Sequence, residues 1–91
     1  MEIQDNNQDI NEKICRTLEF FKQGNLKVHF NVISGKDKGL FRNGFIQNIS
    51  KKQKIFIIKE DVLGLLQYFF EEVDPSSIHP YNERRGEQNG K

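Results

Sequence analysis

The sequence lacks the features of a membrane protein and of a disulfide-stabilised secreted domain. Its longest apolar runs have four residues, as at 55–58, whereas a helix that crosses a bilayer needs about 20. It contains one cysteine, Cys15, and its N-terminus has no apolar stretch behind a basic start, so we expect neither a disulfide framework nor a secretory signal. We therefore predict a cytoplasmic protein with no membrane contact.

The chain also has little net charge, because 14 lysine and arginine residues balance 13 acidic residues to +1. With 91 residues, 35% of them apolar, it has room for one small domain. Residues 1–8 and 82–91 carry almost no apolar side chains, so we predict flexible tails around a domain at 9–81. A folded unit of this size buries little surface, which favours association with a second chain.

The first apolar pattern in the chain has the period of a helix. Apolar side chains recur at spacings of four, four and three, which places them on one helix face: Ile10, Ile14, Leu18 and Phe21. Asp9 suits the N-cap, with Glu12 completing a capping box, and Gly24 is a typical terminator. The pattern predicts a helix over residues 9–23.

The rest of the chain has the short apolar segments and turns of an antiparallel β structure. Apolar and polar residues alternate most clearly at 26–32, which is the period of a half-buried strand. The predicted strands are 26–32, 40–49, 54–59, 64–70 and 78–81. Gly44 favours a sharp bend in the second strand, and residues 74–77 suit a tight helical turn. We therefore predict a mostly β fold, with an N-terminal helix before a five-stranded, strongly bent antiparallel barrel.

This order of elements resembles the Sm-like family, in which an N-terminal helix precedes a five-stranded, SH3-like barrel and subunits form rings that bind RNA. The resemblance covers residues 9–81. Its best local match is residues 39–46, GLFRNGFI, which are similar to the glycine, aromatic, glycine, aliphatic pattern of the family's first motif. The aromatic residue stands one place earlier here than in that pattern. The resemblance implies a homo-oligomer and RNA as a ligand.

The basic residues of the chain are concentrated in one part of it. Residues 22–59 hold nine lysines and arginines against Asp37 alone, and the family's RNA-binding loop corresponds to the turn after the second strand. We expect the nucleic-acid site there, at Ser50, Lys51, Lys52 and Lys54. Ser50 and Lys54 occupy the positions of the family's acidic residue and asparagine, so we expect phosphate contacts with little discrimination between oligouridine and oligoadenine. In the alternative interpretation, these lysines only solvate the surface and protect edge strands.

The fourth predicted strand is apolar on both faces, which indicates that something covers its outer face. The cover is either the N-terminal helix or another chain. The Sm-like resemblance implies that the fourth strand of one subunit pairs with the fifth strand of a neighbour. On that basis we expect a subunit or partner interface at Leu66, Tyr68, Phe69, Phe70 and Ile78. The family's arginine-glycine pair is replaced by residues 71–72, both glutamate, which would repel a phosphate.

No arrangement of residues in the sequence indicates catalysis, a cofactor or a metal. His29 and His79 belong to different predicted elements and have no metal or triad spacing with Cys15. The glycine-rich turn at 35–39 precedes a strand, whereas a phosphate-binding loop precedes a helix. We therefore expect a non-enzymatic protein that self-associates and binds RNA or another nucleic acid electrostatically. The alternative is an SH3-like protein-interaction module or assembly subunit that binds no nucleic acid and uses the apolar fourth strand for a protein partner.

Overall fold

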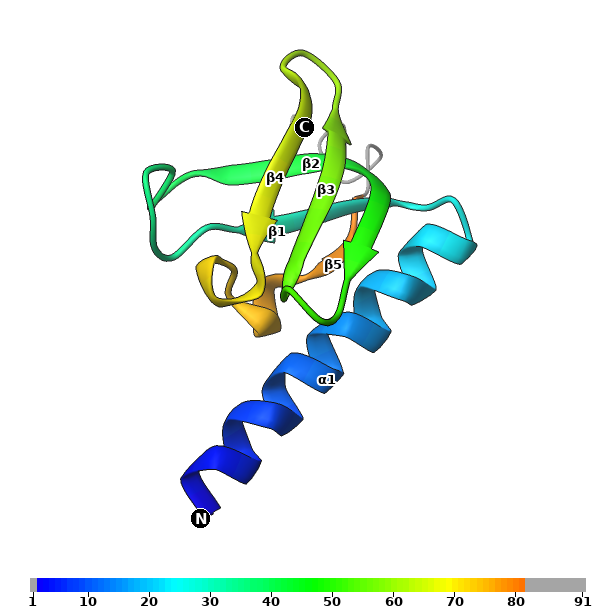
Figure 1. The fold of residues 1–91 in the computed structure, drawn as a ribbon. Helices are drawn as coiled ribbons and strands as arrows, with labels where there is room; N and C mark the ends of the chain where they lie inside the picture. Colours follow the sequence, from blue (N-terminus) through cyan, green and yellow to red (C-terminus); the bar gives the residue numbers. More distant parts are fainter. Residues whose placement is uncertain (1, 82–91) are drawn as a thin grey trace, which may run out of the picture.

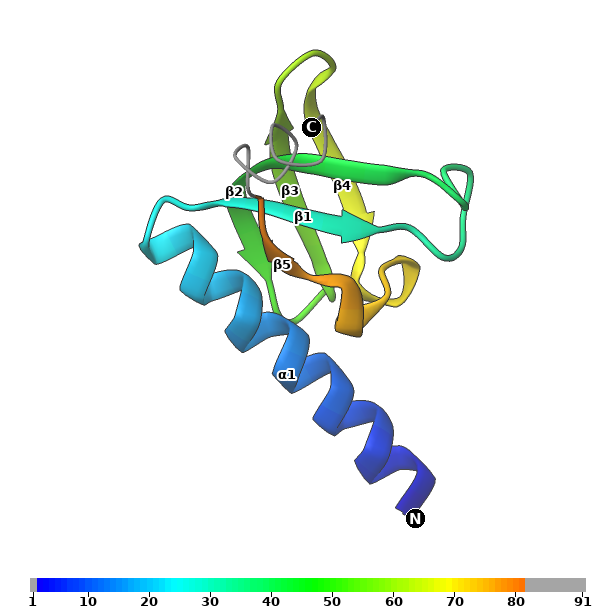
Figure 2. The same ribbon diagram turned by 180° about the vertical axis from the view of Figure 1, so that it is seen from behind.

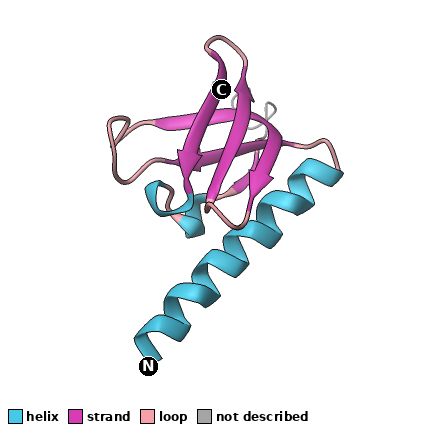
Figure 3. Cartoon of the chain, viewed as in Figure 1, coloured by secondary structure: helices cyan, strands magenta, loops and turns pink. Residues whose placement is uncertain are grey.

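The computed structural model describes residues 2–81, with side chains from Asp9 onward, and shows one helix followed by an antiparallel sheet (Figures 1 and 3). The elements in chain order are helix α1 (Glu2–Gln23), strands β1 (Lys27–Asn31), β2 (Phe41–Ser50), β3 (Ile55–Glu60) and β4 (Gly64–Phe69), 3₁₀ turns η1 (Phe70–Glu72) and η2 (Pro75–Ser77), and strand β5 (His79–Pro80). The mostly β fold with an N-terminal helix is confirmed.

Helix α1 begins at Glu2, so its predicted start at Asp9 is wrong and residues 2–8, predicted as a tail, continue the helix. No glycine or proline interrupts this stretch, so the helix continues through it. Asp9 is thus not an N-cap, and the Glu12 side chain contacts Lys51 instead of completing a capping box. The predicted tail at 82–91 lies outside the described residues.

The five strands form one antiparallel sheet in the order β4-β3-β2-β1-β5. Within residues 2–81 the sheet is not closed, because β4 pairs with β3 alone and β5 pairs with β1 alone. A single bridge between Val32 and Val73 joins the end of β1 to the segment after β4. The prediction of a complete barrel is thus too strong: η1 turns the chain away after β4, and β5 is too short to pair along β4 as well.

Strand β2 bends sharply in the middle, as its glycine predicts (Figure 1). A side chain at Gly44 would place its Cβ 2.6 Å from the backbone oxygen of Lys59 on β3, closer than such atoms approach. The pairing of β2 with β3 also shifts register between Ile46 and Asn48, which adds a bulge just beyond the glycine. The two features together let β2 pair with β1 over residues 41–45 and with β3 over residues 44–50.

The apolar core lies between the concave side of the sheet and one face of α1. The helix contributes Ile14, Cys15, Leu18 and Phe21, and packs mainly against β2. Figures 1 and 2 show the C-terminal half of α1 beside the sheet and its N-terminal half extending past it. Burial raises the pKa of the Cys15 thiol, so Cys15 behaves as a core residue. Over residues 2–81, no helix combines the length and hydropathy that crossing a bilayer requires.

A polar triad attaches the loop between β1 and β2 to the sheet. The Tyr68 hydroxyl donates to Asp37 Oδ2 at 2.6 Å, Arg42 Nε donates to the Tyr68 oxygen at 2.8 Å, and Arg42 Nη2 donates to Asp37 Oδ2 at 3.2 Å. The hydrogen bond from Tyr68, aided by Arg42, lowers the pKa of the Asp37 carboxyl. The loop that holds Lys36 and Lys38 is therefore fixed in place through Asp37.

Candidate nucleic-acid interface

The turn between β2 and β3, residues 51–54, carries the predicted basic site. Ser50 Oγ accepts a hydrogen bond from the Gln53 backbone N–H at 3.3 Å, so the serine hydroxyl shapes the turn. Lys54 closes it in the left-handed conformation, with φ 60, which a lysine adopts less readily than glycine or asparagine. Lys52 and Lys54 are both exposed. The turn therefore presents these two ammonium groups on the surface.

Lys51 has a different role from its two neighbours, because its ammonium group contacts Glu12 on α1 at 2.7 Å. This hydrogen bond lowers the pKa of Glu12 and raises that of Lys51. Of the ion pairs in residues 9–81, none involves Lys52 or Lys54. Lys51 thus ties the turn to the helix, while Lys52 and Lys54 are placed to contact a ligand.

An exposed aromatic ring lies next to this turn. Phe69, at the end of β4, pairs with Ile55 in the register of the sheet, and the Phe70 N–H donates to the Lys54 carbonyl oxygen at 2.8 Å. The Phe69 side chain is 47% exposed. Basic and aromatic residues from segments far apart in the sequence therefore lie at the same end of the sheet. Lys36 and Lys38 lie in the loop at the opposite end of β2 (Figure 1).

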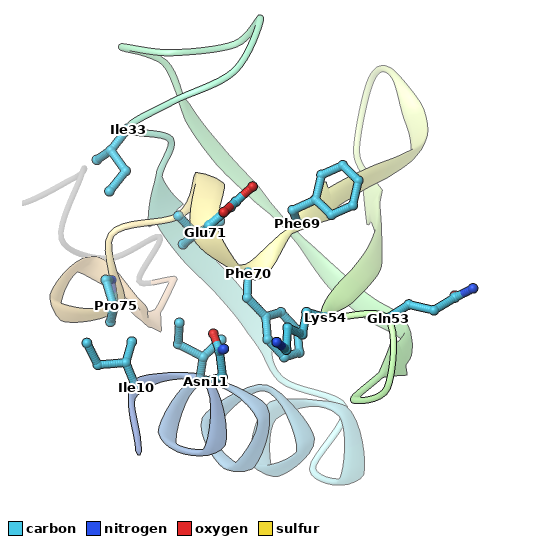
Figure 4. A pocket seen from close by; sticks show the side chains of 11 residues that line it. Ile10, Asn11, Ile33, Gln53, Lys54, Phe69, Phe70, Glu71 and Pro75 are labelled. Atoms are coloured by element: carbon cyan, nitrogen blue, oxygen red, sulfur yellow. The ribbon is translucent and has the colours of Figure 1, made fainter. Parts of the chain in front are cut away.

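A groove of about 640 Å³ separates this end of the sheet from the projecting part of α1 (Figure 4). It is lined by Ile10, Asn11, Ile14, Ile33, Gln53, Lys54, Phe69, Phe70, Glu71, Val73 and Pro75. Its floor is apolar and buried, and Figure 4 shows Asn11 on the helix side of the groove and Lys54 beside Phe70. Gln53 and Phe69 extend outward at the opposite rim. Lys54 therefore belongs both to the basic turn and to the groove.

The two glutamates after β4 are arranged differently from each other. Glu72 Oε1 accepts from the Phe69 N–H at 3.0 Å, and its other carboxylate oxygen lies where a side chain at Gly35 would be. Glu72 thus stabilises the start of η1 and does not line the groove. Glu71 is exposed and does line it. Only one of the two carboxylates is in a position to affect a ligand there.

The structure corrects the predicted interface on β4. Tyr68 and Phe70 are 4% and 1% exposed and pack inside the subunit, so neither presents its side chain to a partner. Leu66 and Ile78 are partly buried against the same core. The reason is the alternation of the strand, which turns Leu66 and Tyr68 inward and Leu65 and Phe69 outward.

The outer face of β4 carries two apolar side chains on either side of Gln67 and is uncovered by α1. Leu65 is 67% exposed and Phe69 47%, and the turn before β4 exposes two further apolar side chains, Val62 and Leu63. The possibility that the helix covers this face is wrong, because α1 packs mainly against β2. Leu65 is missing from the predicted interface, although its spacing of four from Phe69 within a strand places the two on one face.

The two histidines, separate in the sequence, lie side by side in the structure. β1 pairs with β5 so that His29 is opposite His79, with ring centroids 4.9 Å apart. His29 Nδ1 is 2.6 Å from Asn43 Oδ1, and His79 Nδ1 is 3.0 Å from the Ser77 carbonyl oxygen. Among the side chains described from Asp9 to Tyr81, no group of three or more metal-ligating residues is close enough to hold a metal ion.

No protein-family model, curated protein or solved structure matches this chain. The likeness to the Sm-like family therefore stays a hypothesis, which depends on the order of the elements and on residues 39–46.

Proposed function

We propose that this chain is a non-enzymatic Sm-like subunit that self-associates through its sheet edges and binds single-stranded RNA at the turn between β2 and β3. The proposal joins two surfaces of the subunit. One is the basic turn with its aromatic neighbour, and the other is the apolar outer face of β4. Each is supported by its own observation and is tested by its own variants.

The RNA-binding part depends on the hydrogen bond from the Phe70 N–H to the Lys54 carbonyl oxygen, 2.8 Å long. This bond holds the basic turn against the end of β4, so that Lys52, Lys54 and the exposed ring of Phe69 lie at one end of the sheet. Lysines supply phosphate contacts and an aromatic ring supplies a stacking surface, which are the two requirements for binding a single strand.

The self-association part depends on the two sheet edges. Within residues 2–81, β4 and β5 each pair with one strand, so each leaves one edge of the sheet available. The edge at β4 carries Leu65 and Phe69 on its outer face, next to the apolar turn at 62–63. An exposed edge strand with apolar side chains favours pairing with another chain. In this proposal the partner at the β4 edge is a second copy of the same chain.

The RNA site is tested by replacing Lys52 with alanine and Lys54 with asparagine in one double variant. Asparagine suits the left-handed backbone at 54, and Lys51 is kept because it contacts Glu12. Loss of two phosphate contacts is expected to weaken RNA binding and to lower the slope of log affinity against log salt by about 1.4. Fluorescence anisotropy with a labelled single-stranded RNA, over a range of salt concentrations, gives both values.

The matched control is the double variant Lys36→Ala, Lys38→Ala. It removes the same charge at the opposite end of β2, so its slope should stay close to that of the original protein. Equal losses of RNA affinity in the two double variants would show that binding depends only on net charge. The proposed location of the RNA site at the turn between β2 and β3 would then be wrong. Absence of RNA binding at low salt would instead favour the protein-interaction module.

Self-association is tested by the double variant Leu63→Lys, Leu65→Lys, which keeps the Phe69 ring of the proposed RNA site. Light scattering of the original protein should give a mass of several subunits, and the two lysines should reduce it to that of one subunit, because ammonium groups would replace apolar side chains that the second copy covers. The control Phe20→Lys, Leu40→Lys adds the same charge at exposed apolar positions away from β4 and should keep the original mass. A monomer at high micromolar concentration of the original protein would contradict this part of the proposal.

A further inference from the structure

We propose that two copies of this chain pair β4 with β4 around a two-fold axis, so that the assembly is a closed dimer with one continuous sheet. This inference rests on the proposed self-association and names the edge that the second copy supplies. It changes the expectation from the Sm-like resemblance, in which β4 of one subunit pairs with β5 of a neighbour and the subunits form a ring.

Between Ile78 and Tyr81, the strand β5 presents no backbone N–H to a second chain. The Tyr81 N–H donates to the Lys27 carbonyl oxygen at 2.9 Å, and backbone groups alternate sides along an antiparallel strand, so residue 80 is directed outward. That residue is Pro80, which has no N–H. The Ile78 N–H already donates to the Pro75 carbonyl oxygen. Short length and a proline are features that protect a sheet edge, so β5 is poorly suited to pair with another chain.

The open edge of β4 lies on the side away from β3, and the hydrogen bonds of the strand show which residues face it. Figure 1 shows β3 along one side of β4 and no strand along the other. The Phe70 N–H donates to the Lys54 carbonyl oxygen, on the side of β3. Because backbone groups alternate sides, the even-numbered residues of β4 bond to β3 and the odd-numbered residues face the open edge. The Phe69 N–H agrees with this direction, since it donates to Glu72 Oε1 at 3.0 Å and not to β3.

The N–H and C=O groups of Leu65 and Gln67 therefore face the open edge of β4. Such an edge pairs with another strand unless lysine, proline or a bulge protects it. Strand β4 has none of these, because its sequence is GLLQYF and its register with β3 is regular. Leu65, 67% exposed, adds apolar surface that a second chain would cover. Of the two sheet edges, β4 is thus the one suited to pairing.

A second β4 is the partner that these backbone groups fit. In an antiparallel pair centred on Leu66, residue 65 of each copy lies opposite residue 67 of the other, and every N–H and C=O group of these residues finds a partner. A pair centred on Gln67 would instead place Leu65 opposite Phe69. The Phe69 N–H already donates to Glu72, so the Leu65 carbonyl oxygen would lack a donor. The two-fold axis through Leu66 uses both open β4 edges and closes the assembly at two subunits.

The first test removes the backbone donor of Gln67. Gln67→Pro deletes an N–H that points away from β3, so the variant should keep its circular dichroism spectrum. Light scattering should show its mass falling from two subunits to one, because the second copy loses a hydrogen bond and meets a proline at the edge. Gln67→Ala removes the same side chain and keeps the N–H, so this matched control should stay at two subunits.

A disulfide test locates the two-fold axis, and it alone decides if Gln67→Pro does not fold. In the proposed register the two copies of residue 66 form a non-hydrogen-bonded pair with Cα atoms about 4.5 Å apart, within the range that a disulfide spans. Leu66→Cys should therefore give a covalent dimer under mild oxidation, seen on a denaturing gel without reductant. Leu63→Cys, an exposed position in the turn before β4, is the control and should give none, because its two copies lie far from the axis. Cys15 is buried, so the original protein should also give none.

The remaining outcomes separate this inference from the proposed function. A mass above two subunits, with no crosslink at residue 66, would overturn the β4–β4 pair and keep the proposed self-association. A mass of two subunits with no crosslink at residue 66, and no effect of Gln67→Pro, would place the interface elsewhere and overturn the pair as well. A single subunit at high micromolar concentration of the original protein would instead overturn the proposed self-association itself.

Discussion

Replacing Leu18 with alanine is expected to lower the free energy of unfolding by about 3 kcal/mol. Leu18 lies on α1 and is 0% exposed, where it packs with Ile14 and Phe21 against the core. Truncation removes its apolar contacts and leaves a cavity that the rigid sheet fills only in part. The expected loss is a large fraction of the stability of a domain of this size. Urea denaturation followed by circular dichroism measures it.

The control for this prediction is Phe20→Ala on the same helix. Phe20 is 64% exposed, so the change should alter the free energy of unfolding by less than about 0.5 kcal/mol. Comparing Leu18→Ala with Phe20→Ala separates the effect of lost core packing from the effect of changed helix propensity. Equal, small effects at both positions would mean that α1 is not docked on the sheet, and the groove would then lose one of its walls.

Replacing Asp37 with alanine is expected to cost about 2 kcal/mol of stability at neutral pH. The change removes the acceptor of the Tyr68 hydroxyl and the charge opposite Arg42, and both partners are largely buried. A buried donor left without an acceptor accounts for most of the loss. Lys38→Ala, at an exposed position of the same loop, is the control and should leave stability nearly unchanged.

The same triad predicts a pH dependence at the acidic end. Hydrogen bonds from Tyr68 and Arg42 lower the pKa of Asp37 in the folded protein. Between the folded and the unfolded pKa of this carboxyl, the unfolded chain therefore binds more protons than the folded protein does. This stabilisation is present above the unfolded pKa and is lost as the pH falls through the folded pKa. Denaturation of the original protein and of Asp37→Ala, between about pH 7 and about pH 3, should show the difference in stability narrowing on acidification. A difference in stability that stays constant over this pH range would contradict the lowered pKa of Asp37.

Local patterns in the sequence determined most of the secondary structure. The helical period of Ile14, Leu18 and Phe21 and the alternation at 26–32 each depend on residues two to four apart, which a linear sequence displays directly. The bend at Gly44 and the turn at 75–77 were also predictable, because a glycine leaves room for close backbone approach and a proline fixes its own φ angle, whatever their surroundings. The turn lysines 51, 52 and 54 were singled out because they cluster in the sequence, at the position that corresponds to the RNA-binding loop of the Sm-like family.

The tertiary structure alone decided which of these residues meet. It paired Lys51 with Glu12, placed His29 opposite His79, and turned Tyr68 into the core while leaving Phe69 outside. It also formed the groove from α1, the basic turn and the segment after β4, which are remote from one another in the chain. The physical reason is that strand register, the bulge in β2 and the docking of the helix depend on packing the whole core at once. Sequence periodicity indicates that a side chain is buried, but it does not show which other segment of the chain packs against that side chain.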